Sequence, residues 1–110
     1  MEQLLQQLST SLKGELYFDL TAEHQMQLMA YSTDASVYQE KPLAVAIPQN
    51  NEDIKAIIGF ANIHSITIIP RAAGTSLAGQ VVGNGIVVDI SKHFNQMIEV
   101  NIEERWCRVQ

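Results

Sequence analysis

Apolar residues recur at the spacing of a helix face in three stretches of the chain. The first is residues 2–13, with Gln and Ser on the opposite face. Its apolar positions are Leu4, Leu5, Leu8 and Leu12. Gly14 follows directly and is a typical stop signal, so the pattern predicts an amino-terminal helix.

A second helix is expected over residues 21–31, with Asp19 or Thr21 as its cap. Its expected apolar side consists of Met26, Met29 and Ala30. Methionines at this spacing are ordinary core-filling residues, so they do not indicate a cofactor site.

The clearest helix begins at Asn50, a favourable cap residue. Acidic residues follow in its first turn, where the helix dipole favours negative charge. Its predicted apolar face is formed by Ile54, Ile57, Ile58 and Ala61.

Short apolar runs between and after these helices predict strands. Residues 43–47 form a run that Pro48 closes, and its continuous apolar character is typical of a strand buried on both faces. Residues 66–69 and 85–90 form two further strands. The order strand, helix, strand, loop, strand predicts a small parallel sheet with helices on its faces and a right-handed crossover between the first two strands.

Alternating residues near the end of the chain predict an antiparallel hairpin. Residues 97–101 and 106–110 would form its strands, around a turn at Glu103 and Glu104. The sequence stops within the second strand pattern, so we expect a piece of a longer protein. The overall fold class is therefore α/β (α+β), a small parallel sheet followed by a hairpin.

Composition narrows the possible functions. The 46% hydrophobic and 6% aromatic content suits an aliphatic α/β core. A net charge of −5 argues against nucleic acid as a partner, since that requires a basic face. Cys107 is the one cysteine and is expected to be a small strand residue, and no apolar run reaches the length of a membrane span. A cytoplasmic location is the default expectation.

The stretch most suggestive of chemistry follows the 66–69 strand. We call residues 70–80 the small-residue segment; it reads Pro70, Arg71, Ala72, Ala73, Gly74, Thr75, Ser76, Leu77, Ala78, Gly79 and Gln80. Small side chains let a ligand approach the backbone, and glycine can point successive N–H groups into one concavity. Two hydroxyls add donors, and the arginine adds charge or lies at the surface. A tight structural turn would have the same composition, so both interpretations stay open at this point.

Two familiar phosphate-binding patterns are absent from the small-residue segment. No lysine stands between Lys55 and Lys92, which excludes the Gly-Lys-Ser/Thr pattern of P-loops. Nor do the glycines have the G-x-G-x-x-G spacing of a Rossmann fingerprint.

The small-residue segment resembles the diphosphate loop of the FAD-binding domain in the vanillyl-alcohol oxidase and p-cresol methylhydroxylase superfamily. The likeness covers residues 30–110 in the family's order, including the Tyr-Ser-Thr-Asp-Ala-Ser run at 31–36 and the Gly-Asn-Gly-Ile-Val-Val-Asp run at 83–89. It is greatest for the branch of D-lactate dehydrogenase and the glycolate oxidase flavin subunit.

This resemblance implies a fold of two subdomains with FAD between them. Residues 1–31 would be an amino-terminal helical segment, and residues 32–110 the first part of the FAD-binding domain, ending in the opening hairpin of the second subdomain. A cap domain downstream would bind a 2-hydroxy acid. In this branch the flavoprotein is often joined to an iron–sulfur region downstream, and the enzyme could lie at the membrane periphery. The resemblance also implies which residues bind FAD: Pro70, Arg71, Ala72, Ala73, Gly74, Thr75, Ser76, Leu77, Gly79 and Gln80.

Two departures from the family pattern carry consequences. The family often has glycine where Ala72 and Ala73 stand, so the loop path is preserved only if neither position needs a positive φ. Thr75 stands where some members carry a histidine bonded covalently to the flavin. Threonine cannot form that bond, so non-covalent FAD is expected.

The remaining polar residues have more ordinary expected roles. His24, His64 and His93 have no metal-ligand spacing. Asp34 and Ser36 are expected to stabilise a turn, Asp89 either orients the small-residue segment or only ends a strand, and no catalytic base is evident. The alternatives to a 2-hydroxy-acid dehydrogenase or oxidase are an FAD-dependent reductase of the same fold and a non-catalytic nucleotide- or phosphate-binding module.

Overall fold

A four-stranded mixed sheet forms the centre of the molecule. Its strands are β1 (Glu15–Phe18), β2 (Ala44–Ile47), β3 (Ile68–Arg71) and β4 (Ile86–Asp89), arranged in the order β1-β2-β4-β3. The strands β2, β4 and β3 run parallel, whereas β1 pairs antiparallel with β2. The computed structural model, which describes residues 1–110, thus confirms the small, mostly parallel sheet.

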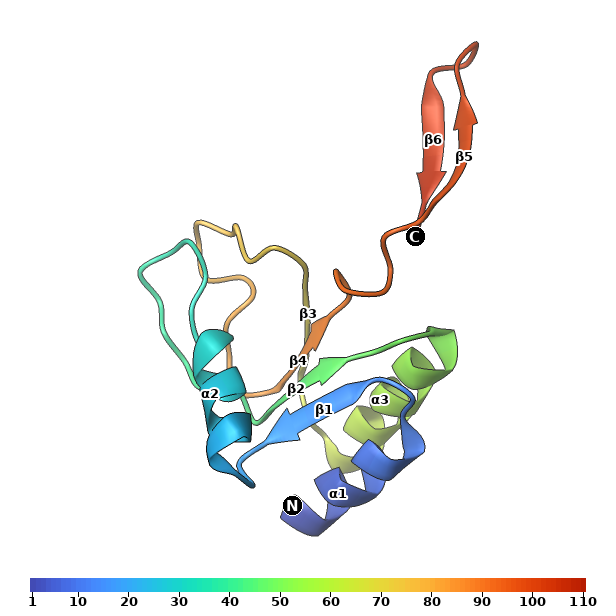
Figure 1. The fold of residues 1–110 in the computed structure, drawn as a ribbon. Coiled ribbons are helices and arrows are strands. Elements are labelled where there is room, and N and C mark those ends of the chain that lie inside the picture. The colour runs from blue at the N-terminus through green and yellow to red at the C-terminus, as the bar shows by residue number, and fades with distance from the viewer.

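Helices cover both faces of this sheet (Figure 1). The helices α1 (Glu2–Ser11) and α3 (Asn51–His64) lie together on one face, and α2 (Ala22–Ala30) lies on the other. The longest of them, α3, has 14 residues. None of the helices is both long and apolar enough to serve as a bilayer span.

The alternation of side chains along β2 and β4 creates two cores. Ala44 and Ala46 belong to the cluster that also holds Leu5, Leu8 and Ile57 from α1 and α3. The other β2 residues, with Val87 and Ile69, pack with Leu28 of α2. Every residue of β2 and β4 is buried, so the expectation that the strand at residues 43–47 is buried on both faces is confirmed.

The strand β1 was missed by the sequence prediction, which placed only a helix stop at Gly14. The four residues from Glu15 to Phe18 are too short a run to give a clear strand pattern. Leu16 and Phe18 are buried against the α1 side of the sheet, while Glu15 and Tyr17 lie half-buried on the other side. A β-carbon on Gly14 would lie 2.1 Å from the Ile47 carbonyl oxygen, so glycine permits the close approach of β1 to β2.

The predicted apolar face of the second helix was wrong. Met26 and Met29 are 74% and 53% exposed, whereas Leu28 is fully buried. The buried face passes through His24, Leu28 and Tyr31, spaced i, i+4 and i+7. Of the two expected caps, Thr21 is the one used, because its hydroxyl accepts a hydrogen bond from the His24 amide at 3.2 Å.

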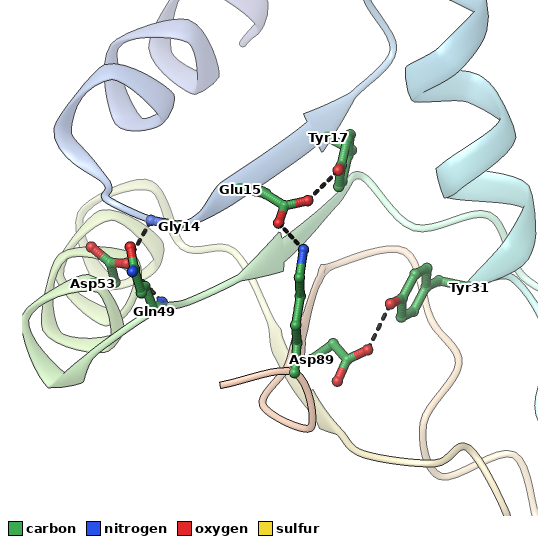
Figure 2. A network of polar contacts seen from close by, with 8 residues as sticks. Gly14, Glu15, Tyr17, Tyr31, Gln49, Asp53 and Asp89 are labelled. Atoms are coloured by element: carbon green, nitrogen blue, oxygen red, sulfur yellow. Dashed lines mark hydrogen bonds and ion pairs between the residues drawn. The ribbon is translucent and has the colours of Figure 1, made fainter. Parts of the chain in front are cut away.

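A buried carboxylate ties α3 to the turn between α1 and β1 (Figure 2). Asp53 accepts hydrogen bonds from the main-chain N–H groups of Lys13, Gly14 and Gln49 at 2.8–2.9 Å. Burial acts to raise the pKa of Asp53, but the three backbone hydrogen bonds outweigh it and hold that pKa below its ordinary value. The predicted cap of α3 is confirmed, since Asn50 Oδ1 accepts from the Asp53 amide at 3.0 Å.

The hairpin of β5 (Met97–Asn101) and β6 (Trp106–Val109) forms a separate two-stranded sheet. It projects away from the central sheet (Figure 1), and nearly all its residues are exposed. The acidic residues Glu99, Glu103 and Glu104 are exposed, and Cys107 lies in β6 but is exposed too. A two-stranded hairpin alone has marginal stability in water.

Candidate functional site

The small-residue segment leaves the sheet at the carboxyl end of β3. Arg71, the last residue of β3, lies opposite Asp89, the last residue of the neighbouring parallel strand β4. The turn at residues 32–36 lies alongside, because the Ala35 amide donates to the Gly74 carbonyl oxygen at 3.1 Å. In parallel α/β sheets this edge, beyond the carboxyl ends of the strands, is where ligands bind.

The main-chain N–H groups from Ala72 to Leu77 donate no hydrogen bond within the chain. Gly74 has φ +70, and no alanine of the segment has a positive φ. Ala72 and Ala73 therefore replace glycine without backbone strain. An exposed run of unpaired amides with a glycine at its centre is a suitable donor set for an anion.

The hydroxyl of Ser76 shapes the second half of the segment. It accepts hydrogen bonds from the amides of Ala78 and Gln80 at 3.3 and 3.1 Å, and it lies 2.6 Å from Gln80 Oε1. Gly79 has φ +71, and the ring of Tyr38 occupies the space that a side chain there would need. By contrast, the Thr75 side chain is exposed and makes no hydrogen bond within the chain.

The guanidinium of Arg71 lies against Gly74 and holds neighbouring segments together. Its Nη1 donates to the Thr33 carbonyl oxygen at 2.8 Å, and a β-carbon on Gly74 would lie 2.4 Å from its Nη2. Arg71 forms no ion pair, although the chain has a net charge of −5. A guanidinium next to unpaired amides favours a negatively charged ligand.

Two of the other expected site residues, Gly79 and Pro70, line separate hollows. A hollow of about 270 Å³ adjoins the segment and is lined by Tyr38, Gln39, Glu40, Ala78, Gly79 and Val82. Pro70 instead lines an apolar groove of about 170 Å³ between α3 and the sheet, away from the amides. Leu77 is 81% exposed and contributes to neither hollow.

The turn role expected of Asp34 and Ser36 is confirmed. The Ser36 amide donates to Asp34 Oδ1 at 2.8 Å, and the Ser36 hydroxyl bonds to the same oxygen. The hydrogen bond from that hydroxyl holds the pKa of Asp34 below its ordinary value. Sequence reasoning missed Tyr31 and Tyr38 as neighbours of the segment. The signal for Tyr31 was its position one helical turn after Leu28.

The residues present fit the diphosphate of a dinucleotide. A diphosphate needs several neutral donors, an approach free of bulky side chains and some positive charge. The amides of residues 72–77, the small side chains around Gly74 and the guanidinium of Arg71 supply these three features.

Comparison with known proteins gives the same picture. The profile of the family described as FAD binding domain matches residues 42–110. D-2-hydroxyglutarate dehydrogenase of Haemophilus influenzae is 42% identical over 85 residues, which are 74% of this chain and 8% of that protein. Glycolate oxidase subunit GlcD of Bacillus subtilis is 37% identical over 84 residues, 74% of this chain and 18% of that protein. The chain thus spans a small part of the curated relatives it matches.

Solved structures share the fold at low sequence identity. A structure of alkyldihydroxyacetonephosphate synthase has a TM-score of 0.74 at 14% identity and covers 94% of this chain and 23% of its own. A structure of 4-ethylphenol oxidase from Gulosibacter chungangensis has a TM-score of 0.68 at 18% identity, covering 93% and 20%. These likenesses confirm the α/β fold. With a family profile that matches more than half of its length, the chain belongs to the FAD binding domain family.

Proposed function

We propose that this chain is the FAD-binding part of a larger 2-hydroxy-acid dehydrogenase or oxidase. In this proposal the amides from Ala72 to Ser76 bind the FAD diphosphate, with Arg71 adding charge and Gly79 and Gln80 closing the loop. The observation that carries the proposal is the run of unpaired amides beside the Arg71 guanidinium at the carboxyl edge of the parallel sheet. The remaining expected contacts, Pro70 and Leu77, are the least supported, because they lie away from these amides.

The substrate class is supported by the names of several relatives. Besides D-2-hydroxyglutarate dehydrogenases and a glycolate oxidase subunit, they include a mitochondrial cytochrome-linked D-lactate dehydrogenase of Kluyveromyces lactis, 32% identical over 90 residues. All three names point to an acid with a hydroxyl on the adjacent carbon. FAD supplies the two-electron acceptor for oxidation of that carbon, and the protein supplies position and electrostatics.

Several further features belong to the same proposal. A substrate-binding cap and an iron–sulfur region in the rest of the polypeptide are supported by the relatives' much greater length, of which the match covers 8–18%. The boundary at residue 31 and a cytoplasmic location also stay proposals.

We also propose that FAD is held without a covalent bond to this segment, because Thr75 offers no nucleophile of the kind that histidine provides. Acid precipitation of the full-length protein should release the flavin into the supernatant. Flavin that stays with the precipitate, with its attachment mapped to residues 70–80, would contradict this expectation.

The test of the function is the visible spectrum of the full-length polypeptide. It should purify with bound flavin, and anaerobic addition of D-2-hydroxyglutarate, D-lactate or glycolate should bleach the flavin absorption. Protein that carries flavin but is bleached by none of the three acids would contradict the substrate class. Protein that neither retains nor takes up FAD would contradict the binding function itself.

A further inference from the structure

Tyr31 lies next to the small-residue segment, where the end of α2, the core and the last residue of β3 meet. It follows α2 directly, and its side chain packs on the core cluster that includes Leu28 and Val87. The Arg71 guanidinium carbon lies 5.1 Å from the centre of the Tyr31 ring, at cation–π distance. The Tyr31 carbonyl oxygen also lies 3.4 Å from Arg71 Nη1. Tyr31 therefore contacts the arginine through both its ring and its backbone.

The phenol of Tyr31 is anchored in turn by Asp89 (Figure 2). Its hydroxyl donates to Asp89 Oδ2 at 2.6 Å. The second carboxylate oxygen, Oδ1, accepts from the amide and hydroxyl of Ser91 at 2.8 and 2.6 Å. Asp89 is only 8% exposed. The carboxylate thus fixes both the ring and the point where the chain leaves β4.

The charge states suit this arrangement at neutral pH. Burial, and then the bond to Asp89, raise the pKa of Tyr31 well above its ordinary value, so the phenol stays protonated and donates. Burial acts to raise the pKa of Asp89, but the hydrogen bonds from Ser91 and Tyr31 outweigh it, so the carboxylate stays charged and accepts. Tyr31 is therefore a fixed support rather than a proton-transfer group.

We propose that Tyr31 is a positioning residue for FAD binding, acting through Arg71 on the backbone of Gly74. The chain of contacts runs from Asp89 to the Tyr31 phenol, from the ring to the guanidinium, and from the guanidinium to Gly74. If the Tyr31 ring moved, the Arg71 guanidinium would no longer be held in place. The backbone dihedrals of Gly74, which set the direction of the neighbouring amides, would then no longer be fixed either. This inference rests on the proposed binding of the FAD diphosphate by the segment.

The test compares Tyr31→Phe with Tyr17→Phe in the full-length polypeptide. Both changes remove a phenol hydroxyl that bonds to a carboxylate, but Tyr17 bonds to Glu15 of β1 (Figure 2), and neither of these two residues contacts Arg71 through a hydrogen bond or a cation–π contact. The measurements are FAD affinity of the apoprotein, from quenching of flavin fluorescence, and the apoprotein's unfolding temperature. Tyr31→Phe should bind FAD about 10-fold more weakly than Tyr17→Phe, because only Tyr31 contacts the Arg71 guanidinium that lies against Gly74.

A double-mutant cycle checks that Tyr31 acts through Asp89. The Asp89→Asn change should weaken FAD binding too. The double variant should have about the same FAD affinity as whichever single variant binds FAD less tightly, because the two residues form one support. If Tyr31→Phe lowers the unfolding temperature but leaves FAD affinity at the wild-type value, Tyr31 is a structural residue only and the proposal fails. If the wild-type apoprotein itself does not bind FAD, the proposed function fails first.

Discussion

At the scale of single residues, the site depends on how Gly74 and Arg71 fit together. Gly74 has a left-handed backbone conformation, and the guanidinium fills the space beside its α-carbon. The arginine does not lie free at the surface, because its Nη1 is bonded to the Thr33 carbonyl oxygen. One side chain thus shapes the backbone and leaves a positive charge beside the unpaired amides.

Replacing Gly74 by alanine tests that fit. A β-carbon would strain the backbone at φ +70 and would displace the Arg71 guanidinium. The cost of such strain is about 1–3 kcal/mol, so FAD affinity of the full-length protein should fall about 10-fold or more in a fluorescence titration. Gly59→Ala is the matched control, because nothing lies within 4 Å of the added carbon and α3 gains helix propensity. Equal FAD affinity in the two variants would contradict the role given to Gly74.

Replacing Asp53 by alanine tests the buried carboxylate between α1 and α3. Three partly buried main-chain amides would lose their acceptor, so the free energy of unfolding should fall by about 2–4 kcal/mol. Urea unfolding followed by circular dichroism measures this loss. The exposed Glu52→Ala, one position earlier in the same helix turn, should change stability little.

The lowered pKa of Asp53 also sets a pH dependence. The carboxylate binds a proton more weakly in the folded chain, so its stabilising effect is present above the unfolded-state pKa of about 3.9 and is lost as the pH falls below that value. Urea midpoints at a series of pH values should therefore drop less steeply below about pH 4 in Asp53→Asn than in the wild type. Parallel curves would contradict this assignment.

At the scale of helices and strands, the long or strongly patterned elements were predictable. The helix α3 and the strands β2 and β4 were found because their apolar runs are long or closed by proline. The strand β3 was placed two residues too early, because it continues through Pro70 to Arg71. The strand β1 was not, since four residues at a sheet edge acquire their meaning only by pairing with β2. The small-residue segment was recognisable from its glycines. The contacts of Tyr31 with Arg71 and Asp89 were not, because these residues are far from Tyr31 in the sequence and the contacts depend on tertiary packing.

The corrected face of α2 gives a prediction at this scale. Leu28→Ala should lower the free energy of unfolding by about 2–5 kcal/mol, because it opens a cavity beneath the helix. Met26→Ala on the opposite side should change it by less than about 0.5 kcal/mol. Thermal or urea unfolding of the two variants distinguishes the faces, and similar losses would mean that the helix packs differently.

At the scale of the whole molecule, the sheet is a platform from which the small-residue segment leaves at the carboxyl ends of the parallel strands, and the exposed hairpin lies beyond it. The small-residue segment and the linker to β5 leave the sheet at the same edge, and the turn at residues 32–36 lies beside that segment (Figure 1). Such a hairpin needs further packing for stability, and the longer relatives of this chain have the additional length to provide it. The platform is thus suited to holding one part of a cofactor while other parts of a larger protein hold the rest.

Amide hydrogen exchange in the full-length protein, with and without FAD, tests the central claim most directly. The amides from Ala72 to Ser76 make no hydrogen bond within the chain, so they should exchange rapidly in the apoprotein. FAD should slow their exchange, while amides of the remote helix α1 keep their rates. Binding of FAD without any slowing at residues 72–76 would contradict the account.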